Sequence, residues 1–345
     1  MAYTEKTDHY YKLPTQLNPF QKKLYRHLIQ WKWHHITTEP GIARGREYDA
    51  ILPDHFVQSE QLPHIYPTIL DVLASHRKMN DFRIHQHFYH MASSQAANIN
   101  LFLPLLHHPE VDTLFRSIKP DFASLAKDHL DQGYCIEYWG GNFGGGHGGK
   151  GILGDKSSMA GTDSDIAIAY LNYKGEHCLW LIEHKLTEKE FTECGAYKSK
   201  GRRPRHDCTQ RFSEIATNKN LCYYHDVRRF KYWELTEQHR NLFVQDNLHK
   251  NCPFKGGMNQ LWRNQLLGLA IENSQDNPYQ NVCFSVVKHP KNDALDATIA
   301  SYKELIAYNP KFSVHNSDEF VSAAHAISDP ELAKWVSWYR DLYQV

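Results

Sequence analysis

Two acidic residues in the middle of the chain stand where a β-hairpin would bring them together. Asp165 lies near the start of one apolar run and Glu183 near the end of the next, with the loop 173–175 between the runs. That loop fits a three-residue hairpin turn with its glycine in the left-handed conformation. If Asn172 then pairs with Glu176, counting seven residues back along each strand places Asp165 directly opposite Glu183. The spacing therefore predicts two facing carboxylates at one end of a hairpin.

Two facing carboxylates would suit a divalent cation. Directly paired residues have Cβ atoms about 4.5–5.5 Å apart, where like charges destabilise a sheet. A bound Mg²⁺ or Mn²⁺ would remove this conflict, polarise a phosphodiester and activate a water for attack. Lys185, two residues after Glu183, could stabilise the developing negative charge, or orient or deprotonate that water. Alternatively, Asp163 and Lys185, which face each other in this register, form an ordinary ion pair and the other two acids project into solvent.

The hairpin is apolar on both faces, which predicts that it is buried. One face carries Ala167, Ala169, Leu179 and Leu181, and the other carries Ile166, Ile168, Tyr170, Trp180 and Ile182. Strands of this kind belong to a sheet that other elements cover on both sides. Charged groups gathered at one end of a covered hairpin are difficult to explain as surface decoration. The pattern therefore favours a functional site.

The surrounding segments predict a mixed sheet with flanking helices. After helical periodicity in the first third, with breaks expected at Pro104 and Pro120, the elements follow the order α-β-β-β-α-β. They are a helix within 111–130, strands at 134–139, 164–172 and 176–186, a helix from Met258 to Glu272, and a strand at 282–287. Further helices are expected from Pro19 onward, over 294–307 and from Pro330 onward, where Asn18 and Asp329 would cap the first and last.

The fold class we predict is α/β (α+β), with a mixed sheet at its core and helices on both sides. Residues 1–110 would form a helical N-terminal extension, 111–310 the core with a cysteine-containing insertion at 187–257, and 311–345 a helical closure. A chain of 345 residues, 41% of them hydrophobic, can bury such a core. No run of eighteen apolar residues occurs and the first residues are polar, so we expect a cytoplasmic protein without a membrane span.

The charge balance limits how the chain could bind a polyanion. Lysine plus arginine (39) equals aspartate plus glutamate (39), so such binding would depend on a local basic patch. A basic run follows the acidic motif and comprises Lys198, Lys200, Arg202, Arg203 and Arg205. Together with Arg263 and Gln265 on the later helix, it could neutralise phosphates and position a nucleic acid. A solvated loop explains the basic run equally well.

The seven cysteines are an odd number in a chain without a recognisable secretory signal, so thiols or metal ligands are expected in place of a disulfide framework. Four of them, Cys194, Cys208, Cys222 and Cys252, fall in the insertion and could hold Zn²⁺ or an iron–sulfur cluster. None of their spacings is CxxC. Isolated buried thiols are therefore the alternative.

Two further patterns favour simpler interpretations. The stretch 144–150 has the glycine and lysine spacing of a phosphate-binding P-loop, but Gly151 replaces the Ser/Thr and no helix signal follows. We expect a glycine-rich loop there, and the antiparallel hairpin also disfavours a P-loop hydrolase. The groups His85-Gln86-His87 and His107-His108 lack a third ligand at a recognisable spacing, which favours core or surface histidines over a metal site.

The segments Gly161-Thr162-Asp163-Ser164-Asp165 and Ile182-Glu183-His184-Lys185, joined by a hairpin, resemble the signature of the PD-(D/E)xK nucleases. The resemblance implies a restriction-endonuclease-like mixed sheet, in which Asp165 and Glu183 bind Mg²⁺ or Mn²⁺ and Lys185 assists catalysis. Ser164 stands where the signature has a proline, which is not a metal ligand. Many members add a glutamate from an earlier element, and Glu137 would supply it here. Some members also hold a cluster with four cysteines, as the insertion could.

A closer resemblance, which covers most of the chain, is to a bacterial family of type II-like restriction endonucleases. It is carried by Ser93-Ser94-Gln95-Ala96, Asn100-Leu101-Phe102, Cys252-Pro253-Phe254 and Arg263-Asn264-Gln265. It implies a Mg²⁺-dependent endonuclease that cuts DNA in restriction, defence or repair. Whether a single chain or a homodimer cuts stays open. The alternative is a non-catalytic nucleic-acid-binding protein with the same fold, in which the acids are structural and the cysteine segment holds a metal.

Overall fold

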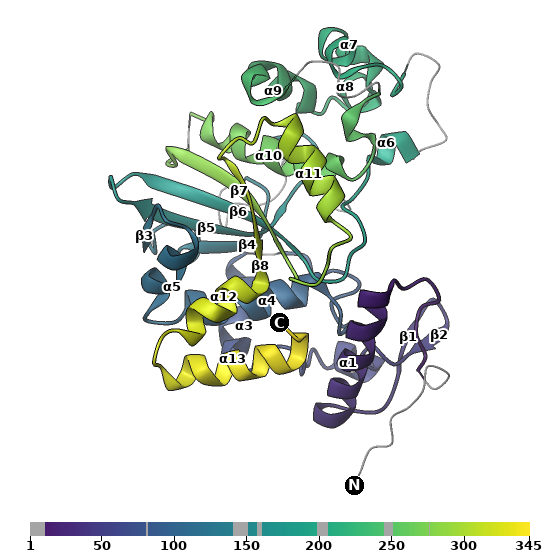
Figure 1. Cartoon of the computed structure of the whole chain (residues 1–345), viewed down its shortest axis with the longest axis vertical. Coiled ribbons are helices and arrows are strands. Elements are labelled where there is room, and N and C mark those ends of the chain that lie inside the picture. Colours follow the sequence, from purple (N-terminus) through teal and green to yellow (C-terminus); the bar gives the residue numbers. More distant parts are fainter. Residues whose placement is uncertain are drawn as a thin grey trace.

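A mixed six-stranded sheet lies between two layers of helices (Figure 1). The computed structural model describes residues 11–80, 82–140, 151–156, 161–198, 206–244, 251–275 and 277–345. The strands of the sheet are β3 (Phe122–Leu125), β4 (Tyr134–Tyr138), β5 (Ser164–Asn172), β6 (His177–Lys185), β7 (Asn281–Lys288) and β8 (Phe312–Asn316). The last four lie side by side in chain order, and β3 and β4 share the outer edge of β5. The pairs β6–β7 and β7–β8 are parallel, and the pairs made by β5 are antiparallel.

The predicted register of the central hairpin is confirmed. The backbone N–H of Asn172 donates to the carbonyl of Glu176 at 3.0 Å, and Gly175 adopts φ +75° in the turn. From there the ladder runs without a shift from Leu171 opposite His177 to Ile166 opposite Ile182. The next position along both strands therefore brings Asp165 and Glu183 to the same level at the far end of the hairpin.

Both faces of the hairpin are covered, as its apolar pattern predicted. The face with Ile166 and Trp180 packs into a cluster with α4 (Ser94–Leu106), α5 (Val111–Ile118), α12 (Ser317–His325) and α13 (Pro330–Tyr343). The face with Ala167 and Leu181 packs against α10 (Met258–Glu272) and α11 (Asp296–Leu305). Figure 1 shows these two layers on opposite sides of the sheet. The alternation of side chains along each strand thus supplies two separate cores.

The remaining elements are shorter or lie at the ends of the layers. The first third contains α1 (Pro19–His35), α2 (Asp54–Gln58), the 3-10 helix Pro67–Ile69 and α3 (Leu70–Met79). The segment between β6 and α10 contains α6 (Gly195–Lys198), α7 (Phe212–Thr217), α8 (Tyr223–Asp226), α9 (Tyr232–Gln238) and the 3-10 helices Lys219–Leu221, Arg240–Leu242 and Pro253–Lys255. None of the helices in the described ranges is long and apolar enough to cross a membrane.

The helix boundaries read from capping residues are confirmed. Asn18 Oδ1 accepts the N–H of Gln21 at 2.8 Å at the start of α1. Asp329 Oδ1 accepts the N–H groups of Glu331 and Leu332 at 2.8 and 2.9 Å at the start of α13. In both helices a proline follows the cap, where its missing N–H costs no hydrogen bond.

Four short strands were not predicted. Residues 111–130 form a helix only as far as Ile118, and after Pro120 the chain turns into β3. The closing segment 311–345 is not entirely helical, because β8 extends the sheet beyond β7. A hairpin of β1 (Gly41–Ala43) and β2 (Arg46–Tyr48) interrupts the helical N-terminal region. Strands of three to five residues carry too few positions for an alternation pattern to stand out.

The break expected at Pro104 is wrong, because α4 continues through it to Leu106. A proline in a helix leaves the carbonyl four residues earlier without its usual donor. Here that carbonyl belongs to Asn100, and it accepts the indole N–H of Trp335 on α13 at 2.9 Å. The contact with the closing helix therefore replaces the hydrogen bond that Pro104 cannot make.

Candidate active site

Three acidic side chains lie side by side on adjacent strands at one end of the sheet. Asp165 is at the start of β5, and Glu183 stands opposite it near the end of β6. On the other edge of β5 the pairs Ile136–Ile166 and Tyr138–Ser164 place Glu137 of β4 at the level of Asp165. The structure therefore brings the predicted acids together, and Lys185 follows two residues later on β6.

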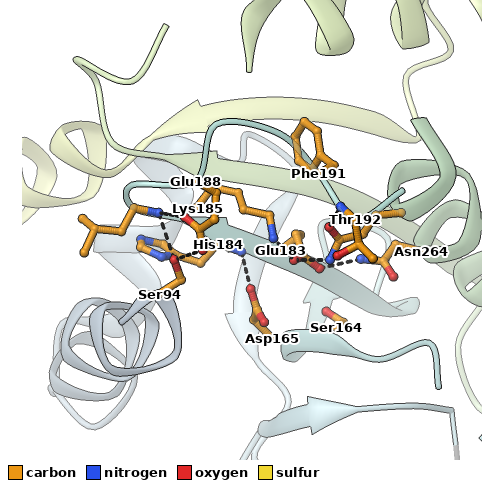
Figure 2. A network of polar contacts seen from close by, with 12 residues as sticks. Ser94, Ser164, Asp165, Glu183, His184, Lys185, Glu188, Phe191, Thr192 and Asn264 are labelled. Carbon is orange, nitrogen blue, oxygen red and sulfur yellow. Dashed lines mark hydrogen bonds and ion pairs between the residues drawn. The ribbon is translucent and has the colours of Figure 1, made fainter. Parts of the chain in front are cut away.

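Glu183 is buried (3% exposed) and its carboxylate is held by three donors. Oε1 accepts the amide of Gln260 at 2.6 Å and the ammonium of Lys185 at 2.7 Å, and Oε2 accepts the amide of Asn264 at 2.7 Å. Figure 2 shows Glu183 between Lys185 and Asn264. Gln260 and Asn264 are one turn apart on α10, so this helix fixes the carboxylate against the sheet. Lys185 thus pairs with Glu183. The alternative interpretation required an ion pair between Lys185 and Asp163, which the structure does not contain.

Asp165 is half-buried and keeps one oxygen available. Its Oδ2 accepts the backbone N–H of His184 at 2.6 Å (Figure 2), and its carbonyl accepts the amide of Asn98 on α4 at 3.1 Å. No described residue donates a hydrogen bond to Oδ1. A carboxylate that is oriented by one oxygen and free at the other is a suitable ligand for a hard cation.

Glu137 adopts a backbone conformation that is uncommon for a side chain of its kind. Its φ is +54°, in the left-handed region, although it lies within β4. Residues with side chains adopt this region at a cost, and such strain gathers at functional sites. The carboxylate Oε1 accepts the amide of Gln95 on α4 at 2.8 Å. The backbone conformation of Glu137 and its hydrogen bond to Gln95 of α4 therefore position its carboxylate beside the other acids.

The acids perturb one another strongly. Burial, followed by the charges of the neighbouring acids, raises the pKa of Asp165 and of Glu137 well above their ordinary values. Asp163 is exposed as a residue, but its carboxyl group is desolvated by the surrounding protein. This desolvation and the charge of Glu183 raise the pKa of Asp163 to about 6. Lys185 is the counterpart, since burial lowers its pKa but the charges of Glu183, Glu188 and Asp165 raise it overall. With all these acids ionised, the cluster would therefore carry more negative charge than Lys185 balances.

These residues fit a divalent cation. Their mutual repulsion is the conflict that a bound ion would relieve, and the donors are the hard oxygens that Mg²⁺ and Mn²⁺ prefer. In the described ranges, no three His, Cys, Asp or Glu side chains are already grouped as ligands of one ion. Mg²⁺ does not require such a cage, because it commonly takes one or two carboxylates and keeps several waters. Asp165 and Glu183 would be those carboxylates.

The repulsion predicts that Asp165→Asn stabilises the metal-free protein at neutral and alkaline pH. A carboxyl whose pKa is raised on folding contributes stability only at low pH, and loses it as the pH rises through the folded pKa. Asparagine removes that loss and still accepts the N–H of His184. At pH 8 in EDTA we expect the Tm of Asp165→Asn to exceed that of the wild type by roughly 2–4 °C, which corresponds to about 1 kcal/mol in a large domain. The difference in Tm should become smaller as the pH is lowered toward 4. An equal or lower Tm at pH 8 would contradict the electrostatic account.

The amide contacts of Glu183 predict a second effect. Asn264→Ala should weaken Mn²⁺ binding or cleavage by about 10–100-fold, as loss of a residue that orients a metal ligand usually does. Asn259→Ala is the matched control, because Asn259 is also a buried amide on α10 and does not contact Glu183. Equal effects of the two substitutions on Mn²⁺ affinity, measured by isothermal titration calorimetry, would show that Asn264 acts only through the fold.

Ser164, which stands at the proline position of the signature, forms hydrogen bonds that connect two strands. Its hydroxyl is completely buried, accepts the N–H of Ile182 at 2.9 Å and approaches the carbonyls of Ile182 and Ile166 at 2.9 and 2.8 Å. The hydroxyl thus links β5 to β6 next to Asp165. Proline is not needed to hold the strand start in this chain.

The residues predicted to bind nucleic acid differ in how exposed they are and in which groups they contact. Gln265 is 1% exposed, and neither its amide oxygen nor its nitrogen has a hydrogen-bond partner, so its burial does not favour the predicted contact with nucleic acid. Arg263 is half-buried, with Nη1 3.5 Å from the carbonyl oxygen of Gly161. Lys198 is exposed and pairs with Glu193 at 2.7 Å. Lys200, Arg202, Arg203, Arg205 and the glycine-rich stretch 144–150 lie outside the described residues.

The four cysteines of the insertion are free thiols. Cys194 and Cys252 are buried, and Cys208 and Cys222 are half-buried. No cysteine belongs to a metal-binding group within the described part of the chain. Burial raises the pKa of Cys222 to about 11, and burial together with the charges of Cys222, Cys208 and Cys194 raises the pKa of Cys252 well above its ordinary value. The four thiols therefore lie close enough to act on one another electrostatically, and binding of Zn²⁺ or an iron–sulfur cluster by them stays a prediction.

Sequence reasoning missed the amide groups that hold the acids in place. The contacts that Asn98, Gln95 and Gln260 make with the acidic residues were not predicted, nor was the pairing of Asn264 with Glu183. The available signal was their helical spacing, since Gln260 and Asn264 lie four residues apart on a helix that was correctly predicted. That spacing indicates a shared face but not which acid it meets.

Comparison with known proteins places this site in a family. No curated protein and no solved structure matches the chain. One family model, REase-ARP, described as "Restriction Endonuclease associating with ARP", matches residues 25–344 and so includes every strand of the sheet and the whole acidic cluster. With this extent of match, the chain belongs to the REase-ARP family of restriction endonucleases.

Proposed function

We propose that the protein is a metal-dependent deoxyribonuclease that hydrolyses DNA phosphodiester bonds at the cluster of Asp165, Glu183 and Lys185. The observation that carries the proposal is the row of Glu137, Asp165 and Glu183 on three adjacent strands, with a buried lysine bound to one of them. Membership of a restriction endonuclease family supports DNA as the substrate.

Each residue has a role that follows from its position. Asp165 and Glu183 would hold Mg²⁺ or Mn²⁺, with Glu137 as a third carboxylate, and the ion would polarise the phosphodiester and activate a water. Lys185 is a cation in the metal-free site, because the charges of the surrounding acids raise its pKa more than burial lowers it. A fixed cation at this place stabilises the negative charge that develops on the phosphate. Charge stabilisation is therefore the role that we propose for Lys185.

The amides around the cluster provide preorganisation. Gln260 and Asn264 fix Glu183, Gln95 fixes Glu137, and the N–H of His184 fixes Asp165. Because these donors are in place before substrate binds, little reorganisation is needed during the reaction. Glu183 retains capacity for an ion, since a carboxylate has about four acceptor positions and three are used here.

The experiment that tests the proposal is cleavage of supercoiled plasmid by purified protein with Mg²⁺, Mn²⁺ or EDTA, comparing the wild type with Glu183→Ala. We expect nicked or linear DNA with metal, and none with EDTA or with the variant. Linear product at early times would indicate that both strands are cut in one binding event. Binding of DNA without cleavage under all three conditions would reject the nuclease and leave a non-catalytic binding protein.

A further inference from the structure

The segment 82–87 is attached to the acidic cluster through one side chain. Gln95, in the first turn of α4, is 7% exposed. Its Oε1 accepts the backbone N–H of His85 at 2.9 Å, and its Nε2 donates to the carbonyl of Arg83 at 3.0 Å and to Glu137 Oε1 at 2.8 Å. Both amide hydrogens and the amide oxygen are therefore used. Turning the amide over would break all three hydrogen bonds, so Gln95 holds the segment and Glu137 in one arrangement.

The ends of this segment are anchored in the fold. Phe82 and Phe88 are buried in the core under α4. Just before them, the amide of Asn80 donates to the carbonyl of Ile136 at 2.9 Å, one residue before Glu137. The side chains between the two phenylalanines point mainly outward, and Arg83, His85, Gln86 and His87 are exposed. The segment thus presents basic side chains from a fixed backbone beside the acids.

The charged site acts directly on these side chains. His85 lies in the field of Lys185 and Glu188, and burial, His87 and Arg83 lower the pKa of His85. Nδ1 of His85 accepts the N–H of His87 at 3.3 Å, and the two rings lie 5.2 Å apart. With Nδ1 occupied as an acceptor, the neutral ring carries its proton on Nε2. His85 therefore offers a donor whether neutral or charged.

The other cations around the acids are already engaged. Lys185 pairs with Glu183, Lys156 Nζ lies 3.2 Å from the ring centroid of Trp139, and Arg263 faces the carbonyl of Gly161. By contrast, Arg83, His85 and His87 form no ion pair with any residue in the described ranges. A polyanionic substrate approaching an acidic cluster needs exposed positive groups to offset the repulsion.

We propose that residues 82–87 are a phosphate-binding segment of the active site, in which Arg83, His85 and His87 contact the DNA backbone next to the cleaved phosphate and Gln95 couples the segment to Glu137. The proposal rests on the proposed nuclease function. It names a DNA-binding segment that the basic run of the sequence did not include. Contacts of this kind fix the register of DNA without reading its sequence.

The test is the salt dependence of DNA binding. For the triple variant R83A/H85A/H87A, we expect a Kd for a short DNA duplex in EDTA, measured by fluorescence anisotropy, at least about 10-fold weaker than wild type. The slope of log Kd against log salt should fall by about one, for the phosphate that Arg83 no longer neutralises, because His85 with its lowered pKa contributes mainly as a neutral donor. All three side chains are exposed, so the fold should be unaffected. Lys174→Ala is the control, because Lys174 lies in the β5–β6 turn, more than about 20 Å from Asp165 at 3.3 Å per strand residue.

Coupling through Gln95 has its own readout. Gln95→Met should weaken DNA binding, and adding it to the triple variant should cause no further weakening, because both changes remove the same interactions with DNA. Additive effects of the two changes on the Kd would overturn the coupling.

Three outcomes separate this proposal from the proposed function. An unchanged Kd and slope in the triple variant, with normal cleavage, would overturn the segment and leave the nuclease intact. If the triple variant binds DNA more weakly than the wild type, but the wild type never cleaves DNA, the phosphate-binding role of the segment would be supported and the nuclease function rejected. A wild type that does not bind DNA would overturn both.

Discussion

Asp165→Asn should abolish metal-dependent DNA cleavage, lowering the rate by at least about 10³-fold, and should also remove high-affinity Mn²⁺ binding. Asp165 offers a carboxylate oxygen that is oriented yet accepts no hydrogen bond from a described residue, and asparagine puts a neutral amide in its place. The change is close to isosteric, and the N–H of His184 keeps an oxygen acceptor. The loss should therefore occur in a folded protein. Single-turnover cleavage and titration calorimetry with Mn²⁺ measure the two effects.

A matched control lies at the other end of the same hairpin. Glu176→Gln also converts an acid to an amide, beside the turn, where Glu176 accepts a hydrogen bond from Asn172 at 2.7 Å. It should leave both cleavage and Mn²⁺ binding unchanged. Asp165→Asn with wild-type cleavage, or a similar loss in Glu176→Gln, would show that Asp165 is not a metal ligand. Glu183→Gln should behave like Asp165→Asn, since it removes the other predicted ligand.

Lys185→Met should lower the cleavage rate by about 10²–10³-fold and leave Mn²⁺ binding intact or stronger. The ammonium lies 2.7 Å from Glu183 and Lys185 is only 7% exposed, so solvent screens its charge weakly. Methionine is also long and unbranched, so it can fill the same space without the charge. Gln260 and Asn264 would still hold Glu183 for the ion.

The contrast between rate and metal affinity is the informative result for Lys185. If Lys185→Met loses Mn²⁺ binding to the same extent as Asp165→Asn, the lysine organises the ligands and does not stabilise charge on the phosphate. If it cleaves at the wild-type rate, the lysine has no part in the reaction. Lys174→Met, at an exposed lysine in the distant turn, controls for the loss of a positive charge.

The sequence predicted the centre of the site because its geometry is local. A turn with a left-handed glycine fixes the hairpin register, and the register alone sets Asp165 opposite Glu183. The apolar alternation on both faces then required a covered sheet, and the structure supplies α4 on one side and α10 on the other. Glu137 was reached through resemblance, and its left-handed backbone could not be predicted, because strands rarely contain that conformation.

The remaining features depend on contacts between distant parts of the chain. Asn264 lies 81 residues from the Glu183 that it holds, and Gln95 lies 42 residues from Glu137. Helical spacing puts such amides on one face, but only the packing of the helix on the sheet decides which acid they meet. Gln265 shows the same limit, since a polar residue of a motif proved to be buried. β3 and β8 were missed because short edge strands take their form from the neighbouring strand.

The most direct measurement of the central claim is the position of Mn²⁺ in crystals of the wild-type protein, located by anomalous scattering. The account predicts a peak at the end of β5 and β6, within bonding distance of Asp165 and Glu183, that is absent from crystals of Asp165→Asn. Mn²⁺ bound elsewhere, or no bound ion at a concentration that supports cleavage, would contradict it.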